Sequence, residues 1–430
     1  MVALDLPFLS RDSSGFAKYA LNSSPNAIAS SSVTLGESAV KIVPKKFKVH
    51  SLTGRITREL MRQAFKAVKK NRGAAGLDKV SIQMFERNLE HLDALMRGLK
   101  SGSYQPIPLK RVFLEKAPGK FRPLGIPAVR CRVAQEVARR LINQIFERQF
   151  HDDSYGYRSG RSCHKAIAQV LKCARQGYRV VLEADIKGFF DNIPHKLIMN
   201  LLAAEIADGN ILRLIEKFLK SGVMEDGVLK PTKIGTPQGG VISPLLANIV
   251  LNYLDWQLQL HGFRFSRFAD DFVVMCKTRR QAEEALVLVK RILQDLELEL
   301  SPEKTKITRF VDGIEFLGFT ISSRTVRMRA KSEEKFKNKI REITERSHNL
   351  DAVVIEKLNR VIRGTVNYFC APFATTLKQF SRLDEWIRKR IRCMKYERIS
   401  RADNKRMKNK HIYRLGLLSC RDLCLAVKER

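Results

Sequence analysis

The chain reads RFSRFADDFVVMC from Arg264 to Cys276. Two runs rich in strand-forming residues, Phe265–Phe268 and Phe272–Cys276, flank a turn that contains Asp270 and Asp271. This pattern predicts a hairpin of two short strands. Adjacent carboxylates in a tight turn repel each other unless cations neutralise them. An exposed Asp-Asp turn is also common in hairpins, so this stretch alone leaves a structural and a metal-binding interpretation open.

A third carboxylate follows a second predicted strand. Tyr178–Ala184 is apolar and β-branched, as a buried strand is, and Asp185 comes directly after it. Two Mg²⁺ ions about 3.5–4 Å apart, the arrangement used for in-line phosphoryl transfer, need hard oxygen ligands of this kind. Asp185, Asp270 and Asp271 are therefore candidate metal ligands.

The charge balance points to a polyanionic partner. Lys and Arg number 79 against 44 Asp and Glu, which gives a net charge of +35. Residues 321–430 alone contain 29 Lys and Arg and 12 Asp and Glu. A surface that contacts only water needs no such excess of positive charge, whereas a surface that binds the phosphate backbone of a nucleic acid does. No run of eighteen apolar residues occurs, so no transmembrane helix is expected.

The eight cysteines form neither a zinc pattern nor a disulfide framework, and we expect reduced thiols in a cytoplasmic, nucleic-acid-associated protein. Residues 1–45 are predicted to be a flexible Ser-rich leader. The acids Asp5, Asp12 and Glu37 count against an organellar transit peptide, although Lys18 and the serines are compatible with one.

Three blocks in order resemble the motifs of reverse transcriptases. Leu182–Asp191 resembles motif A, and Arg267–Asp271 resembles motif C, in which Phe268 replaces the usual Tyr. Between them, the segment GTPQGGVISPLLAN at Gly235–Asn248 is similar to the block that supports the incoming nucleotide. Three such blocks in the right order argue against the interpretation of Asp270-Asp271 as an exposed turn without function.

Further blocks resemble those of bacterial group II intron reverse transcriptases: Asn71–Asp78, Lys120–Pro127, Ser154–Arg161, Ser301–Thr305, Phe316–Phe319, Arg363–Phe369 and Trp386–Arg392. The resemblance covers roughly residues 50–430, and Ser159 departs from it at a position where Pro is usual. It implies an α+β right-hand polymerase with fingers, a palm with an antiparallel sheet, and a C-terminal helical thumb or maturase domain. The expected boundaries are 46–177 for the N-terminal extension and fingers, 178–315 for the palm, and 316–430 for the primer grip and thumb.

The resemblance also implies roles for single residues. Two Mg²⁺ ions, or Mn²⁺ in their place, would be held by Asp185, Asp270, Asp271 and the Ile186 carbonyl, with Lys304 as proton donor to pyrophosphate. The expected nucleotide contacts are Lys120, Arg122, Phe190 and Gln238, and the expected template–primer contacts are Arg158, Arg161, Phe268 and Gly318. Without a functional role, Phe190 would be an aromatic residue of the core and Lys304 an ordinary surface lysine. The basic thumb residues expected to bind RNA are Arg388, Lys389, Arg390, Arg392, Lys405, Arg406, Lys408 and Lys410.

The function that this pattern implies is RNA-directed DNA synthesis of the group II intron lineage. The partners would be an RNA template, a DNA primer, deoxynucleotides and structured intron RNA, with no membrane. Two alternatives remain at this stage: a domesticated, intron-free enzyme of DNA repair or phage defence, and an RNA-binding splicing factor with a vestigial polymerase. The clustered acids count against the splicing factor, because a binder of polyanions has no use for them.

Overall fold

The structure is a computed structural model that describes residues 48–87, 90–117, 119–236, 239–345, 349–398 and 400–429. The expected leader at 1–45 lies outside these residues. The chain divides into two compact units that alternate along the sequence. The first takes in residues up to 161, 185–270 and 285–303, and the second takes in 162–184, 271–284 and 304–430. No described helix is both long and apolar enough to cross a membrane.

Helices build the N-terminal part of the first unit: α1 (Arg58–Lys70), α2 (Ile82–Arg87), α3 (Glu90–Ser101) and α4 (Val129–Phe146), preceded by the 3-10 turn η3 (Thr53–Arg55). Thr57 caps α1 by accepting a hydrogen bond from the Leu60 backbone N–H. One side of α1, with Met61, Ala64, Phe65 and Val68, is buried, and the helix packs on α4. Apolar residues recur at helical spacing over residues 56–70 and 132–150, and this spacing predicts both α1 and α4.

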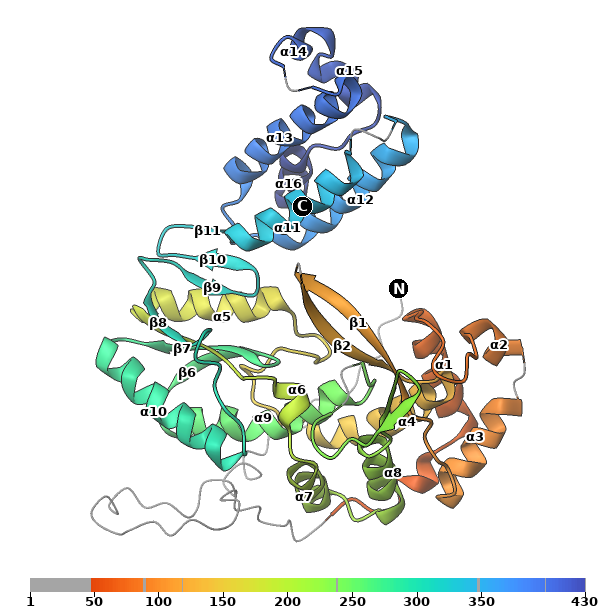
Figure 1. Ribbon diagram of the computed structural model, residues 1–430. Coiled ribbons are helices and arrows are strands. Elements are labelled where there is room, and N and C mark those ends of the chain that lie inside the picture. Colours follow the sequence, from red (N-terminus) through yellow and green to blue (C-terminus); the bar gives the residue numbers. More distant parts are fainter. Residues whose placement is uncertain are drawn as a thin grey trace. The chain divides into compact units, whose positions relative to one another are not determined.

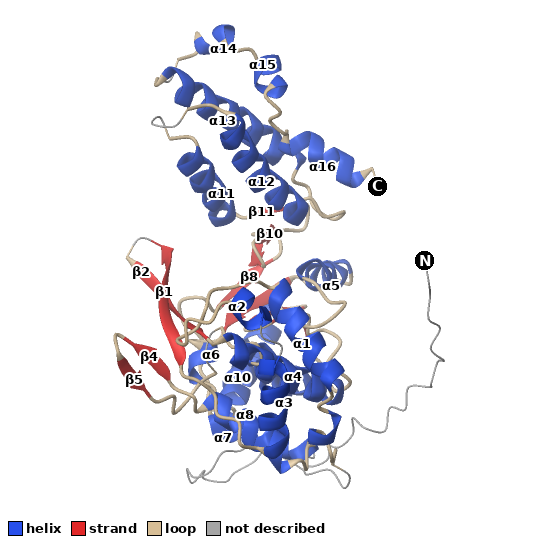
Figure 2. Ribbon diagram, turned by 90° about the vertical axis from the view of Figure 1, so that its right-hand side faces the viewer, coloured by secondary structure: helices blue, strands red, loops and turns tan. Residues whose placement is uncertain are grey.

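The finger sheet has the strand order β2-β1-β4-β5; Figure 1 labels β1 and β2, and Figure 2 labels all four strands. Its strands are β1 (Leu109–Ala117), β2 (Lys120–Ile126), β4 (Val223–Glu225) and β5 (Val228–Lys230). The turn-forming residues at 116–119 indicate a hairpin of two short strands, and β1 and β2 form it, with Lys110 opposite Ile126. β4 then adds to β1 in parallel, with Leu109 opposite Val223. This pairing joins segments that are more than a hundred residues apart in sequence, and no local sequence pattern predicts it.

Helices α6 (Phe189–Asn192), α7 (His195–Glu205), α8 (Gly209–Leu219) and α9 (Ser243–Leu260) complete the first unit, together with β6 (Arg264–Phe268). α9 is buried on nearly every side and has its proline in the first turn. The sequence offers Asn192 as a candidate N-cap for the helix after motif A, with Pro194 in its first turn, and this expectation is wrong. Asn192 ends α6, and Pro194 is the residue that precedes α7.

The palm sheet has the order β6-β7-β3-β8. β3 (Val180–Asp185) and β7 (Asp271–Cys276) are buried along most of their length, as their apolar sequences predict. β8 (Lys306–Arg309) runs antiparallel to β3, with Val180 opposite Arg309. Helix α5 (Cys163–Arg175) packs on β7, and α10 is Arg279–Asp295.

The C-terminal part begins with a small antiparallel sheet of β9 (Ile314–Phe316), β10 (Phe319–Ile321) and β11 (Val326–Met328). Helices follow, as the sequence predicted (Figure 2): α11 (Ala330–Ile343), α12 (Ala352–Phe369), α13 (Leu377–Tyr396), α14 (Asp403–Arg406), α15 (Asn409–Arg414) and α16 (Cys420–Lys428). α13 and α12 both pack on α16. The buried Asp384 of α13 accepts hydrogen bonds from the Ser419 hydroxyl and the Cys420 N–H at the start of α16.

One prediction about the cysteines is wrong. Cys370, at the end of α12, and Cys424, in α16, form a disulfide with their Cα atoms 5.6 Å apart. They are 54 residues apart in sequence, and only the packing of α16 on α12 brings them together. Cysteine spacing could not predict this pair, because it forms neither a repeated motif nor a local loop.

Candidate active site

The turn between β6 and β7 carries two acidic side chains. Ala269 has a φ of +60°, a backbone conformation that residues other than glycine rarely adopt. Asp270 lies in the turn and Asp271 begins β7, and both are partly exposed. The Phe268 ring lies 6.4 Å from the Tyr157 ring, measured between centroids. The strained turn therefore presents both carboxylates at the end of the hairpin.

Asp185 is the last residue of β3 and is also partly exposed. The segment at 299–301 fixes the backbone around it. The Ser301 N–H donates to the Asp185 carbonyl at 2.8 Å, and the Lys187 N–H donates to the Glu299 carbonyl at 2.9 Å. Ile186 forms an isolated bridge with Leu300. The strand end that carries the carboxylate is thus anchored on both sides of Asp185.

One hydrogen bond sets the relative direction of β3 and β7. The Arg179 N–H, just before β3, donates to the carbonyl of Cys276, the last residue of β7, at 2.9 Å. The two strands are neighbours in the sheet and can overlap along their length only if they are antiparallel. The carboxyl end of β3 therefore points the same way as the amino end of β7.

Tyr157 links Asp270 to an expected nucleotide contact. The Tyr157 side chain is exposed, but partial desolvation by the surrounding protein raises the pKa of its phenol, the Asp270 carboxylate raises it further, and the Arg122 guanidinium lowers it. Arg122 and Asp270 therefore act on the same hydroxyl. Arg122 is exposed on β2, and Lys120 begins that strand. Gln238 lies outside the described residues.

The start of the Gly235–Asn248 block is folded onto motif A. The Thr236 N–H donates to the Phe190 carbonyl at 2.6 Å, and the Gly235 N–H donates to the Ile193 carbonyl at 2.9 Å. A side chain at Gly235 would collide with the Asp191 backbone, so this glycine is required for the close approach. Phe190 is 8% exposed and Phe189 is 2% exposed, and their rings meet edge to face.

Arg158 was expected to contact the template backbone, and the structure contradicts this. Its side chain is buried, with Nε donating to Glu147 at 2.9 Å and Nη1 donating to the carbonyls of His151 and Ser154. A guanidinium committed to these partners holds the 151–158 loop rather than a phosphate. Arg161 is more exposed and pairs with Asp152 at 2.7 Å.

The turn that was expected to grip the primer lies between β9 and β10. Gly318 has a φ of +83° there. Its carbonyl accepts hydrogen bonds from the Ser332 hydroxyl and the Arg329 N–H, and the Tyr368 hydroxyl donates to the Leu317 carbonyl at 2.9 Å. Contacts from α11 and α12 thus hold this turn. Lys304 is exposed in the turn before β8.

The basic thumb residues divide into two groups. Lys389, Lys405, Arg406, Lys408 and Lys410 are exposed. Arg392 is buried and donates to the Met407 carbonyl and to Asn409 Oδ1, which contradicts its expected role in RNA binding. The Arg390 guanidinium donates twice to Thr344 and Arg388 donates to the Tyr413 hydroxyl, so both also have structural contacts.

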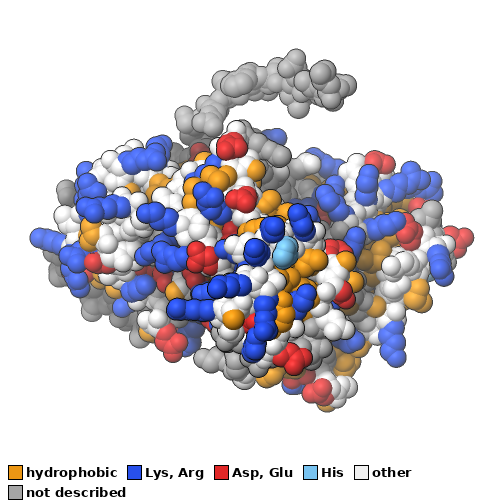
Figure 3. All heavy atoms as spheres, turned by 90° about the horizontal axis from the view of Figure 1, so that it is seen from above, with side chains coloured by type: hydrophobic (Ala, Val, Ile, Leu, Met, Phe, Trp, Pro, Cys, Tyr) orange, Lys and Arg blue, Asp and Glu red, His pale blue; other side chains and the backbone are white. Residues whose placement is uncertain are grey.

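A hollow of about 420 Å³ opens beside α13. Four cationic residues line it, together with two amide residues and a single acid: Arg388, Lys389, Arg392, Lys408, Asn404, Asn409 and Glu385. The pKa of Arg392 is lowered, by burial first and by the charge of Arg388 second. In Figure 3, Lys and Arg side chains spread over the visible face and exceed the acidic ones.

Sequence reasoning missed a buried ion pair next to the acidic turn. Arg267 and Asp255 are both fully buried, and their atoms Nη2 and Oδ2 lie 2.5 Å apart. The signal was present in the sequence, because a charged residue in the middle of a buried strand requires a partner. The identity of that partner, one turn from the end of α9, could not be read from spacing.

Comparisons with known proteins identify the family of the chain. Residues 113–321 match the family described as reverse transcriptase (RNA-dependent DNA polymerase), and residues 333–413 match the maturase-specific domain of group II introns. Protein YkfC of Escherichia coli is 35% identical over 302 residues, which are 60% of this chain and 79% of YkfC. This chain belongs to the group II intron reverse transcriptases. The enzyme class of the family is RNA-directed DNA polymerase.

The group II intron-encoded protein LtrA of Lactococcus lactis is 33% identical over 303 residues, covering 55% of this chain and 50% of LtrA. The match thus spans half the length of that relative. Among solved structures, a chain of a partial Cas6-RT-Cas1–Cas2 complex is 28% identical, with a TM-score of 0.37, covering 57% of this reverse transcriptase and 41% of that chain.

Proposed function

We propose that this reverse transcriptase extends a DNA primer on an RNA template, with Asp185, Asp270 and Asp271 as the ligands of two Mg²⁺ ions. The observation that carries the proposal is the register of the palm strands. Continuing the antiparallel register from the Arg179–Cys276 hydrogen bond sets Asp185 opposite Asp270. Directly opposed residues in such a pair have Cα atoms about 4.5–5.5 Å apart. Their carboxylates can then share an ion.

The donor set fits Mg²⁺. Three carboxylates and the Ile186 backbone carbonyl are hard oxygen ligands, which this ion prefers to nitrogen or sulfur. Within the described ranges, no three His, Cys, Asp or Glu side chains are already gathered for a metal. Mutual repulsion separates like charges until cations bind between them. When bound, the metals would activate the attacking primer hydroxyl and neutralise charge on the phosphates.

The remaining residues of the chain would position the substrates. We propose that Lys120 and Arg122 hold the triphosphate, and that Gln238 lies against the nucleotide. Lys304 would protonate the departing pyrophosphate. Phe190 would exclude a ribose 2′-hydroxyl through its ring, and the hydrogen bond from the Thr236 N–H to its carbonyl would hold its backbone in place. Phe268, Arg161 and Gly318 would contact the template and primer.

We further propose that residues 46–177, 178–315 and 316–430 act as fingers, palm, and primer grip with thumb. The thumb would hold structured intron RNA through the exposed cations of α13–α15. The hollow beside α13 supports this, because its exposed lysines Lys389 and Lys408 face a single acid, Glu385, and would repel each other without an anion. An RNA backbone phosphate supplies that anion, and the place of action would be the bacterial cytoplasm.

The test of the catalytic proposal is Asp270→Asn. This change keeps the shape of the side chain but removes a negative charge from the metal site, so primer extension should fall by several orders of magnitude while RNA binding persists. Asp226→Asn is the matched control, because Asp226 is exposed in the β4–β5 turn at a φ of +51°, which Asn tolerates. Undiminished extension by Asp270→Asn would refute the assignment.

A further inference from the structure

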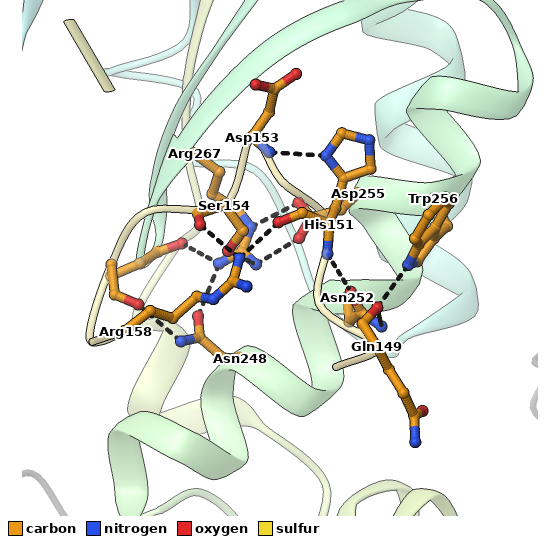
Figure 4. Close-up of polar contacts among 12 residues, drawn as sticks. Gln149, His151, Asp153, Ser154, Arg158, Asn248, Asn252, Asp255, Trp256 and Arg267 are labelled. Carbon is orange, nitrogen blue, oxygen red and sulfur yellow. Dashed lines mark hydrogen bonds and ion pairs between the residues drawn. The ribbon is translucent and has the colours of Figure 1, made fainter. Parts of the chain in front are cut away.

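Arg267 lies in β6, two residues before Ala269 in the turn that carries Asp270, and uses all five of its N–H donors. Nε and Nη2 bind the two carboxylate oxygens of Asp255 at 2.7 and 2.5 Å. Nη2 also donates to the Ser154 hydroxyl at 2.7 Å, and Nη1 donates to Asn248 Oδ1 at 3.1 Å. The fifth hydrogen bond, also from Nη1, goes to the Ala269 carbonyl at 3.0 Å. Figure 4 shows Arg267 together with Asp255, Ser154 and Asn248.

The bond to Ala269 bears directly on the acidic turn. The Ala269 carbonyl belongs to the peptide that leads into Asp270, and Ala269 itself has a φ of +60°. A non-glycine residue keeps such a conformation only where its surroundings impose it. The guanidinium is fixed by Asp255 and Asn248, both from α9, so it can act as a rigid clamp on that carbonyl.

The 154–157 loop closes the other side of the turn. The Tyr155 N–H donates to the Arg267 carbonyl, and Asn248 Nδ2 donates to the Gly156 carbonyl at 2.8 Å. A Cβ atom at Gly156 would meet the Phe268 carbonyl carbon at 3.1 Å and would come still closer to the Ala269 nitrogen. The loop therefore packs directly on the Phe268–Ala269 peptide.

We propose that Arg267 is a positioning residue that sets the direction of the Asp270 carboxylate by clamping the Ala269 carbonyl. The inference rests on the proposed metal role of Asp270. The positive charge of Arg267 is neutralised by Asp255 within a bidentate pair, so its effect on the site is one of geometry rather than of charge. The geometry belongs to the guanidinium fork, which a lysine ammonium cannot reproduce.

The decisive variant is Arg267→Lys, which keeps the charge beside Asp255 but loses the fork. The readout is Mn²⁺ affinity, measured by paramagnetic resonance titration of the protein bound to a primer–template with a chain-terminated primer. Loss of a residue that orients a metal ligand weakens metal affinity about 10–100-fold, and this is the expected result. The Mg²⁺ concentration for half-maximal extension should rise in parallel, while primer–template affinity stays unchanged.

Ser154→Ala is the matched control, because it removes a buried hydrogen bond to Nη2 but leaves the Nη1 contact with Ala269 intact. It should lower thermal stability without changing Mn²⁺ affinity. Gly156→Ala tests the same clamp without touching Arg267, because the added methyl group displaces the Ala269 peptide; it should weaken Mn²⁺ binding. This variant decides the question if Arg267→Lys does not fold.

Unchanged Mn²⁺ affinity in folded Arg267→Lys, or in Gly156→Ala, would overturn the positioning role. Equal weakening in Ser154→Ala would overturn it as well, because general destabilisation would then explain the effect. Asp270→Asn separates this failure from that of the proposed function. Wild-type Mn²⁺ affinity in Asp270→Asn would refute the metal site itself, whatever Arg267→Lys does.

Discussion

Replacing Lys405, Arg406, Lys408 and Lys410 by Ala should flatten the salt dependence of RNA binding. The three lysines are exposed, whereas Arg406 lies 3.8 Å from the buried carboxylate of Asp403. We therefore count about three phosphate contacts rather than four. Each phosphate neutralised on a duplex contributes about −0.9 to the slope of log affinity against log salt concentration. The slope of the quadruple variant should therefore be less negative than that of the wild type by about 2.7.

This slope converts into a measurable difference in affinity. Between about 50 and about 200 mM salt, the wild-type affinity should fall about 40-fold more than that of the variant. The assay is fluorescence anisotropy with labelled intron RNA, and with an unrelated RNA of equal length, over a series of salt concentrations. Primer extension on saturating template should persist, because the four side chains lie outside the palm.

The control replaces cations that acids already neutralise. Lys220 pairs with Glu216 at 2.6 Å and Arg360 pairs with Glu356 at 3.0 Å, so Lys220→Ala and Arg360→Ala should leave the slope nearly unchanged. An unaltered slope in the quadruple variant would refute the thumb as the RNA surface. Equal wild-type affinity for both RNAs at physiological salt would contradict recognition of intron RNA.

Two further predictions concern sugar selection and the disulfide. Phe190→Ala should raise ribonucleotide incorporation, whereas Phe189→Ala should only lower the midpoint of thermal unfolding. Single-nucleotide extension with matched ribo- and deoxynucleotides measures the sugar preference of both variants. An unchanged sugar preference in Phe190→Ala would make Phe190 a core residue alone. Cys424→Ser should destabilise the unit that contains α12 and α16 by about 2–4 kcal/mol and abolish its sensitivity to reductant. Denaturant unfolding with and without dithiothreitol measures this, and equal reductant sensitivity in wild type and variant would contradict the pair with Cys370.

The fold elements that were predicted correctly are those with local signals. The apolar run before Asp185 predicts β3, the turn at residues 116–119 predicts the β1–β2 hairpin, and helical spacing predicts α1 and α10. The parallel addition of β4 to β1 was missed, because β4 is three residues long and its partner lies far back in the chain.

The location of the candidate site could be predicted from the sequence. Which of its basic residues are available to phosphate and which make structural contacts could not. Arg158 and Arg392 are basic residues within or beside family motifs, and their sequence context does not separate a phosphate contact from a structural one. The difference is made by acceptors elsewhere in the chain: Glu147 for Arg158, and the Met407 carbonyl for Arg392. Arg267 was missed for the same reason, since its partner Asp255 is identified only by the packing of α9 on β6.

The parallel pairing of β1 with β4 has a consequence for synthesis of the chain. Leu109 and Lys110 leave the ribosome more than a hundred residues before their partners Val223 and Met224. At about 5–20 residues per second, the edge of β1 waits about 6–23 s for the strand that covers it. An uncovered strand edge is a template for pairing with other chains. Phe113 and Phe121 of the same hairpin are 51% and 61% exposed in the finished fold, so the nascent hairpin offers both an open edge and apolar side chains. Newly made chains are therefore most prone to self-association while residues 127–222 are being translated, and slowing translation across that interval should lower the yield of native protein.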